Sequence, residues 1–206
     1  MPSPADGIID LYSRRAADWD SDRSRDLPER PWLDRFLAHV PRSGSVLDLG
    51  CGSGEPIARY LIEQGRAVTG VDAAPGLIAL CRARIADQDW INADMRGLDL
   101  GRRFDGLIAW NSSFHLSRPE QRALVTVFAR HLKPGGVLMF TSGDEDGERI
   151  GEWRGEPLYH ASLSIADYRA GLDAGGFSVI DPVVGDSARG EATVWLCRLR
   201  GGTMAE

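Results

Sequence analysis

The stretch VLDLGCGSGEP, residues 46–56, leads from an apolar strand pattern through three alternating glycines into a helical pattern. Gly50, Gly52 and Gly54 place no side chain between the backbone and a ligand. The helix that follows begins with amide groups that have no partner within the helix and can bind polar ligand atoms. The stretch therefore predicts a pocket for a nucleotide-like molecule.

The spacing of the glycines separates two kinds of nucleotide pocket. A dinucleotide fold has the pattern G-x-G-x-x-G, in which the third glycine lets a pyrophosphate approach the helix. Here Glu55 occupies that position. A carboxylate at a helix start repels a pyrophosphate, whereas Asp48 and Glu55 suit a ligand with a cationic sulfonium and an ammonium group. The charges favour a cationic ligand over NAD.

Residues 46–54 resemble the first motif of the class I S-adenosylmethionine (SAM)-dependent methyltransferases, and further matches follow in order. Residues 67–72, 90–95 and 104–116 resemble later segments of that family. Residues 132–140 match its helix end, turn and strand, with Pro-Gly-Gly expected to form the turn. The resemblance spans about Ser45 to Ser142, and four ordered motifs are far more specific than one glycine-rich loop.

The resemblance implies SAM as cofactor, with S-adenosylhomocysteine (SAH) as product. Asp72, at the end of the second strand, is expected to accept hydrogen bonds from both ribose hydroxyls. Asp94 and the backbone of Met95 are expected to read the adenine, and Trp110 to border the sulfonium or to pack at a strand end. The expected cofactor-binding residues are Tyr12, Arg15, Asp48, Gly50, Gly52, Gly54, Asp72, Ala73, Asp94, Met95 and Trp110.

An N-terminal helical segment precedes the first motif. Tyr12, Arg15, Ala16 and Trp19 recur at spacings of three and four, so they share one helix face. They resemble the Tyr-x-x-x-Ala-x-x-Tyr lid of small-molecule methyltransferases, in which the first tyrosine covers the methionine end of SAM; here tryptophan replaces the second. The alternative is an amphipathic helix that packs on the core.

Helix-like and strand-like runs alternate from Ser45 onward, which predicts a Rossmann-like, doubly wound α/β fold. With the resemblance, we expect a mostly parallel seven-stranded sheet with an antiparallel C-terminal strand and an N-terminal helical lid, all in one domain. The expected parts are a lid (1–44), a SAM-binding core (45–142), an acceptor-binding loop (143–163), and a C-terminal helix with antiparallel strands (164–200). The expected helices are 8–20, 29–39, 56–64, 75–86, 119–131 and 165–174, and the expected strands are 46–49, 67–71, 90–91, 107–110, 137–141, 177–184 and 192–199.

The loop expected at 143–163 is too long for a plain connection and carries Tyr159 and His160. Methyl transfer needs mainly a well-placed nucleophile, and a general base assists where the acceptor carries a proton. His115, His160 and Tyr159 are the candidate catalytic residues. For His115 the alternative is a structural histidine that bonds a backbone carbonyl.

Composition narrows the partners. The formal net charge of −6 and the scattered arginines disfavour a nucleic-acid acceptor. The longest apolar runs are too short for a membrane helix, and the start of the chain has no signal pattern. Three widely spaced cysteines predict reduced thiols in the cytoplasm, and no metal-ligand spacing occurs. We expect a methyltransferase for a small molecule; the alternatives are a SAM-binding protein without catalysis and an NAD-dependent oxidoreductase.

Overall fold

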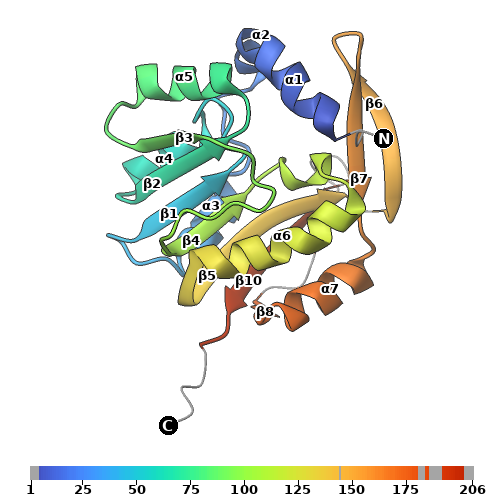
Figure 1. Cartoon of the computed structure of the whole chain (residues 1–206). Helices are drawn as coiled ribbons and strands as arrows, with labels where there is room; N and C mark the ends of the chain where they lie inside the picture. The colour runs from blue at the N-terminus through green and yellow to red at the C-terminus, as the bar shows by residue number, and fades with distance from the viewer. Residues whose placement is uncertain (1–4, 144, 181–183, 186–191, 202–206) are drawn as a thin grey trace.

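The computed structural model describes residues 5–143, 145–180, 184–185 and 192–201. Its main sheet has the strand order β3-β2-β1-β4-β5-β10-β8, and β9 pairs with β10 beside this path (Figure 1). The strands are β1 (Ser45–Leu49), β2 (Ala67–Asp72), β3 (Asp89–Asn92), β4 (Phe104–Ala109), β5 (Leu132–Gly143), β8 (Phe177–Val179), β9 (Val184–Gly185) and β10 (Ala192–Leu199).

Strands β1 to β5 run parallel, and β10 is antiparallel to its neighbours β5, β8 and β9. The expected doubly wound, mostly parallel sheet with an antiparallel C-terminal strand is confirmed. The strand order reverses direction between β1 and β4. In such sheets the crevice at the carboxyl ends beside this reversal is where ligands bind.

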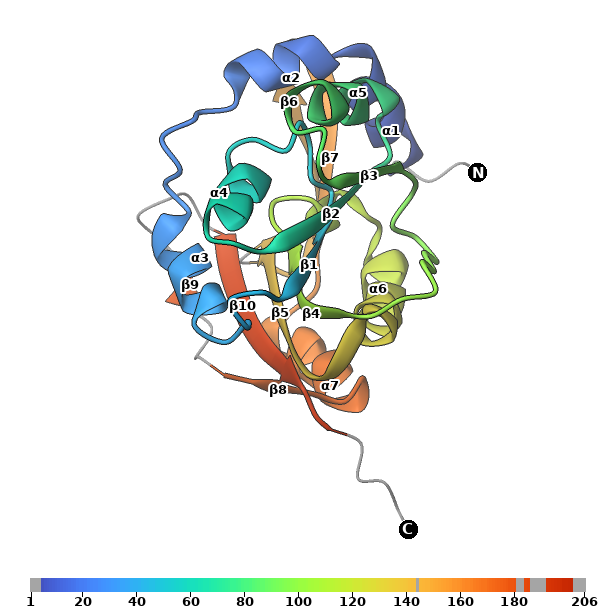
Figure 2. The same ribbon diagram turned by 90° about the vertical axis from the view of Figure 1, so that its left-hand side faces the viewer.

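Helices cover both faces of the sheet (Figure 2). On one side lie α3 (Arg30–Leu37), α4 (Ile57–Glu63) and α5 (Pro75–Arg84); on the other lie α6 (Arg118–His131) and α7 (Ile165–Ala174). Successive residues of a strand point to opposite faces of the sheet. Val46 and Ile108 pack in the apolar layer on the side of α3, α4 and α5, and Leu47, Leu107 and Ala109 pack in the layer on the side of α6 and α7. Burial on both faces explains why these strands read as nearly continuous apolar runs.

The expected lid helix is two helices, α1 (Asp6–Arg14) and α2 (Ala16–Asp22). They separate at Arg15, which leaves helical geometry with φ −111° and ψ 22°. No glycine or proline marks the break. The Arg15 side chain bonds Glu156 and Asp18 instead, so a tertiary contact accompanies the break.

The segment expected to be an acceptor-binding loop contains a β-hairpin, β6 (Gly147–Trp153) and β7 (Glu156–Ser162). Its turn consists of Arg154 and Gly155, both with positive φ, as two-residue hairpin turns require. The hairpin stands beside the lid helices α1 and α2 (Figure 1). Residues 147–162 are therefore ordered by backbone pairing, and the expectation of a loop was wrong.

Two other expectations differ at the strands. Strand β5 begins at Leu132, and Pro134 to Gly136 lie inside it as an irregularity opposite β4, where Gly135 has φ +79°. They do not form a separate turn. Strand β8 ends at Val179, short of the expected end at Val184. Residues 186–191 of the hairpin expected before β10 lie outside the described residues. Over the part of the chain that the structure describes, no helix has the length and apolarity to cross a membrane.

Candidate active site

A cavity of about 100 Å³ lies at the carboxyl ends of β1, β2 and β4, beneath the lid helices. Several predicted cofactor-binding residues meet there, together with the candidate base His115. The lining includes Tyr12 and Trp19 from the lid, and Gly50, Gly52, Asp72, Ala73, Asp94, Met95, Arg96, Asn111, Ser112 and His115 from the body. We call this the cofactor cavity.

The glycine loop leaves no room for side chains. Gly50 has φ +75°, and a Cβ there would lie 2.3 Å from the Cβ of Ser112. Gly52 has φ +57°, and a Cβ there would lie 3.3 Å from the indole nitrogen of Trp19. The position of Gly50 thus requires glycine for conformation and for space, and that of Gly52 requires it for conformation, with Trp19 packed closely against it. Gly54 faces Trp90 and Cys81 behind the loop, so its role is packing.

Two carboxylates lie at the strand ends beside the loop. Asp72 accepts hydrogen bonds from the backbone amides of Gly52 and Ala74, both at 2.9 Å. Desolvation nevertheless raises the pKa of Asp72 to about 6. Asp48 is buried on β1, where desolvation and the charge of Asp72 raise its pKa to about 7. Asp48 is not among the described residues that line the cofactor cavity.

Asp94 is held by an arginine that the sequence reasoning missed. Arg96 bonds Asp94 through Nε at 2.8 Å and through a terminal nitrogen at 2.6 Å, and its backbone amide reaches the other Asp94 oxygen at 2.8 Å. The same guanidinium bonds Asp6 of α1 and Glu120 of α6. Arg96 therefore joins α1, the loop that follows β3, and α6. The sequence did offer one signal for this contact, because Arg96 lies only two residues after Asp94.

His115 is the last residue of the short 3-10 helix η1 (Ser113–His115), and it is buried. Its Nδ1 lies 2.8 Å from the carbonyl oxygen of Tyr159, which only accepts, so Nδ1 carries the proton. Nε2 then accepts from the Tyr12 hydroxyl at 3.0 Å. Burial lowers the pKa of His115 to about 4, so the ring is neutral at pH 7.

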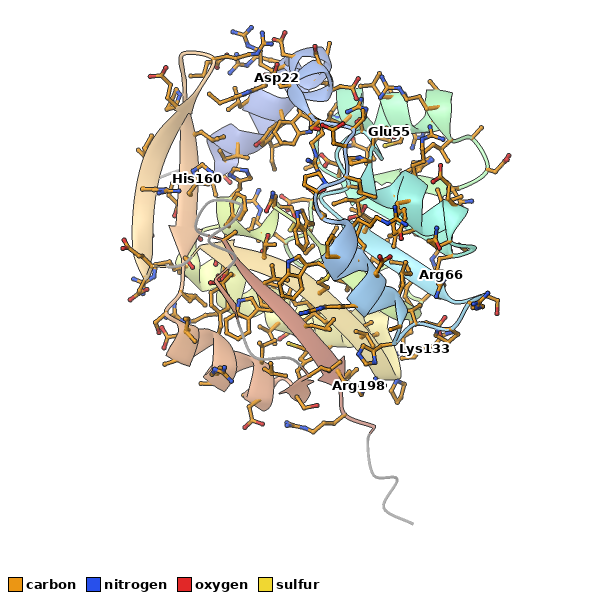
Figure 3. All side chains as sticks on the ribbon, turned by 180° about the vertical axis from the view of Figure 1, so that it is seen from behind. Asp22, Glu55, Arg66, Lys133, His160 and Arg198 are labelled. Carbon is orange, nitrogen blue, oxygen red and sulfur yellow. The ribbon has the colours of Figure 1, made fainter. Side chains whose placement is uncertain are left out.

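A second cavity of about 580 Å³ adjoins η1, the end of β5 and the hairpin. We call it the outer cavity. It is lined by Asn111, Phe114, Ser142, Gly143, Glu145, Asp146, Gly147, Glu148, Arg149, His160, Ala161, Ser162 and Ala192. Figure 3 shows the His160 side chain pointing from the hairpin toward the body of the molecule. Asn111 lines both cavities.

A buried amide positions the segments that carry the two histidines. Gln121 of α6 donates from Nε2 to the carbonyl oxygens of Leu116 and Ala161, at 2.8 and 2.9 Å. These residues directly follow His115 and His160 in the chain. The hydroxyl of Tyr168 in α7 donates to the other end of the same amide. Sequence reasoning missed Gln121, because only the fold reveals that it faces the core.

Some predicted residues lie away from the cavities. Trp110 packs against the apolar layer of α3 and α4, because strand alternation sends it to the opposite face from Ala109. Glu55 pairs with Arg59 at the start of α4, so its carboxylate does not line the cofactor cavity. The Tyr159 side chain packs with Ile8, and only its carbonyl reaches His115.

The lid and the hairpin tip are joined by ion pairs. Glu156 accepts from Arg14 and Arg15 at 2.8 Å each. Arg154 bonds Asp22 at 2.8 Å and Asp18 at 3.2 Å. Arg15 therefore contacts the hairpin and does not line the cofactor cavity. Trp153 adds ring contacts with Tyr12 and Trp19, and its indole bonds Asp22.

The residues of the cofactor cavity fit SAM. Gly50, which admits no Cβ, allows close backbone approach, Asp72 offers carboxylate oxygens for ribose hydroxyls, and Asp94 and Met95 line the same cavity with an acceptor carboxylate and a backbone amide that would suit an adenine. Among the described residues that line the cavity, the guanidinium is that of Arg96, which is already held by Asp94.

Comparison with known proteins gives the same class. The family described as methyltransferase domain matches residues 46–136. A trans-aconitate 2-methyltransferase of Methylobacterium nodulans is 32% identical over 187 residues, which cover 79% of this chain and 70% of the relative. The chain belongs to the class I SAM-dependent methyltransferase family.

Other relatives differ in what their names say they methylate. A dTDP-3-amino-3,6-dideoxy-alpha-D-glucopyranose N,N-dimethyltransferase of Streptomyces fradiae is 31% identical over 159 residues, covering 75% of this chain and 56% of the relative. The chain spans about half the length of the first curated relatives that it matches. In fold it resembles the 1,6-didemethyltoxoflavin-N1-methyltransferase of Burkholderia thailandensis, with a TM-score of 0.71, 21% identity, and coverage of 97% and 92% of the two chains.

Proposed function

We propose that this chain transfers a methyl group from SAM to a small-molecule acceptor. The observation that carries the proposal is the contact of two cavities at Asn111: the residues that line one suit SAM in their chemistry, and the other, about 580 Å³, has the size of a small-molecule site. SAM, when bound, supplies an electrophilic methyl group on a sulfonium. Asp72 would accept from the ribose, Asp94 and Met95 would bind the adenine, and Tyr12 would cover the methionine end.

The protein's own groups would supply orientation and a base. Holding a nucleophile in line with a methyl group accounts for most of the acceleration that such a reaction needs. His115 and His160 are the proposed bases, and both have a pKa lowered by burial, so they are neutral at pH 7. The hydroxyl of Tyr159 is a weaker candidate, because burial and the neighbouring Glu148 raise its pKa to about 12.

A small acceptor is favoured over nucleic acid by the state of the arginines. Four arginines near the cavities, Arg15, Arg96, Arg118 and Arg154, are in ion pairs, so they do not form a free track for phosphates. The three buried cysteines are free thiols, which supports the cytoplasm as the compartment. We further propose one domain, in which residues 1–44 cover the cofactor and residues 143–163 contact the acceptor.

Calorimetry with SAH and Asp72→Asn tests the cofactor site. The wild-type protein is expected to bind SAH, and Asp72→Asn is expected to weaken binding at least tenfold, because the charged acceptor for two hydroxyls is lost. Asp89→Asn, an exposed aspartate on β3, is the matched control. Binding without methyl transfer to any compound would indicate a SAM-binding protein without catalysis, and absence of SAH binding would refute the proposal.

A further inference from the structure

The outer cavity meets the cofactor cavity at a wall of rings and one strained residue. Asn111 has φ 48°, and its backbone amide is held by the hydroxyl of Thr141 at 2.8 Å. Beside it, the ring centroids of Phe114 and His160 lie 5.2 Å apart, and those of His115 and His160 lie 4.9 Å apart. A molecule in the outer cavity therefore reaches the cofactor cavity past Asn111 and the two imidazoles.

The two imidazoles have the same orientation of donor and acceptor. Nδ1 of His160 lies 3.1 Å from the carbonyl oxygen of Leu158, and Nδ1 of His115 contacts the next carbonyl in β7, that of Tyr159. Since carbonyl oxygens only accept, both Nδ1 atoms carry protons and both Nε2 atoms are acceptors. Tyr12 occupies the Nε2 of His115, whereas no described residue is hydrogen-bonded to the Nε2 of His160.

Because Nε2 of His160 is a hydrogen-bond acceptor in the lining of the outer cavity, it favours a ligand that donates a hydrogen bond. An amine or a hydroxyl can give a proton to Nε2 of His160, but a carboxylate brings only acceptor oxygens. Two rings 4.9 Å apart also oppose the protonation of both, so a carboxylate cannot rely on a pair of imidazolium ions for charge.

The charged side chains that line the outer cavity also favour a cationic ligand over an anionic one. The outer cavity has three carboxylates, those of Glu145, Asp146 and Glu148, against the single guanidinium of Arg149. Arg118 offsets part of this charge, because it pairs with Asp146. The described lining still carries more negative than positive charge. A cationic ligand is attracted there, and an anionic ligand is repelled.

We propose that the outer cavity binds a methyl acceptor whose nucleophile is an amine, and that His160 receives its proton. The proposal rests on the proposed function and chooses between two classes that the relatives represent, amine and carboxylate acceptors. The ammonium form gives one proton to Nε2 of His160. The freed nitrogen lone pair then forms the N–CH₃ bond while the C–S bond breaks and leaves its electron pair on sulfur, so the product nitrogen carries the positive charge.

The chemistry of the labelled product tests the class of acceptor. The protein would be incubated with methyl-labelled SAM and a deproteinised bacterial metabolite extract, and the products would be treated with base. An N-methyl product is stable to base and is retained on a cation exchanger. A methyl ester releases its label as methanol, and an ether gives a stable neutral product; either result as the main product would overturn the proposal.

A binding experiment on the SAH complex tests the cavity without turnover. The probes are D-glucosamine and D-glucuronate, which have similar ring size and opposite charge, and the readouts are ligand-observed NMR and the ¹⁵N shifts of His160. We expect glucosamine to bind and to shift the His160 signals, and glucuronate to bind at least tenfold more weakly. Equal or reversed preference, or no binding of either probe, would contradict an amine site.

Two variants distinguish a failure of the proposed amine site from a failure of the cofactor site. His160→Phe keeps the ring against Phe114 but removes the acceptor nitrogen, so it is expected to weaken glucosamine binding at least tenfold while SAH affinity is unchanged. Glu152→Gln removes a charge from the same hairpin outside the cavity and is expected to change neither. Unchanged glucosamine binding in His160→Phe would overturn the role of His160. Loss of SAH binding in the wild type would instead refute the proposed function.

Discussion

At the residue scale, Asp48 contributes an electrostatic cost to folding. The unfolded chain gives this carboxyl its ordinary pKa of 3.8, whereas desolvation and Asp72 raise the folded value to about 7. The folded chain therefore holds the proton more tightly, and stability falls as pH rises from about 4 to about 7. Above pH 7 the full cost is present, and the difference in pKa corresponds to at most about 4 kcal/mol.

We expect Asp48→Asn to raise the free energy of unfolding at pH 8 and to have a much smaller effect at pH 4.5. Urea denaturation at the two pH values measures this difference, and changes at other carboxyls largely cancel between variant and wild type. Asp89→Asn, in which the replaced side chain is exposed on β3, serves as the control. A gain that is the same at both pH values would show that the charge of Asp48 is not the cause.

Tyr12 is expected to act through its hydroxyl as well as its ring. Tyr12→Phe keeps the contact with Trp19 but removes the donor to Nε2 of His115. A buried acceptor without a partner costs about 1 kcal/mol or more, so SAH affinity should fall about fivefold if the lid closes on the cofactor. Titration calorimetry measures the affinity of each protein for SAH. Tyr60→Phe, which removes a hydroxyl bonded to Asp34 on the far side of the glycine loop, is expected to leave affinity unchanged; equal losses would contradict the role of Tyr12.

Single residues were predictable where the backbone dictates the residue type. The glycines and Asp72 lie at the ends of strands, where a local pattern fixes both position and chemistry. Trp110 lies one residue beyond β4, and the direction of its side chain depends on alternation that a four-residue strand pattern does not fix. Arg96 and Gln121 were missed. The short spacing of Arg96 from Asp94 was a local signal, but the partners Asp6 of Arg96 and Ala161 of Gln121 are 90 and 40 residues away in the chain.

At the scale of elements, the helices α1 and α2 line the cofactor cavity, the hairpin lines the outer cavity, and ion pairs join the two. The ion pairs of Glu156 and Arg154 with the lid join the part that covers the cofactor to the part that borders the outer cavity (Figure 3 labels Asp22 at this junction). Exposed ion pairs contribute little individually and are screened by salt. We expect these ion pairs to act mainly on the rate at which the lid helices move away from the hairpin.

Glu156→Gln is expected to raise the dissociation rate of SAH about threefold, because it removes the shared partner of Arg14 and Arg15. Stopped-flow displacement of SAH measures the rate. Raising the salt concentration to about 0.5 M should raise it in the wild type and have less effect in the variant. Glu152→Gln loses the same charge from the same hairpin without a described bond to the lid. Equal rates in all three proteins would show that the lid opens independently of the hairpin.

The hairpin itself was not predictable from strand periodicity. Strand β6 is half-exposed or exposed along its whole length, and its residues include Glu148, Arg149 and Glu152. Without a buried face there is no alternation to detect. The signal that was present is Arg154-Gly155, a turn that glycine favours because both residues take positive φ. By contrast, α7 was predicted at its observed bounds, because its cap Ser164 and its glycine end are local signals.

At the scale of the whole molecule, the cofactor cavity draws on segments that are distant in the chain. The lid supplies Tyr12, the ends of β1 and β2 supply Gly50 and Asp72, and η1 supplies His115. The alternation of helices and strands, with the family resemblance, predicted the doubly wound, mostly parallel sheet, so this part of the fold was predictable. The meeting of lid, sheet and hairpin was not, because it depends on the ion pairs and rings at the hairpin tip.

A ligand that contacts all these segments should stabilise the molecule as one unit. At a concentration 100 times its Kd, SAH is expected to add about 2.7 kcal/mol to the free energy of unfolding. For a chain of this length that corresponds to a rise in Tm of roughly 5 to 10 °C. NADH is expected to give no rise, because Asp72 and Asp94 bring negative charge to the cofactor cavity, and the guanidinium among its described lining residues, that of Arg96, is already held by Asp94. Differential scanning calorimetry with each ligand, repeated on Asp72→Asn, measures both effects. An equal rise with NADH would favour a dinucleotide-binding enzyme, and a rise with SAH that persists in Asp72→Asn would place the ligand outside the cofactor cavity.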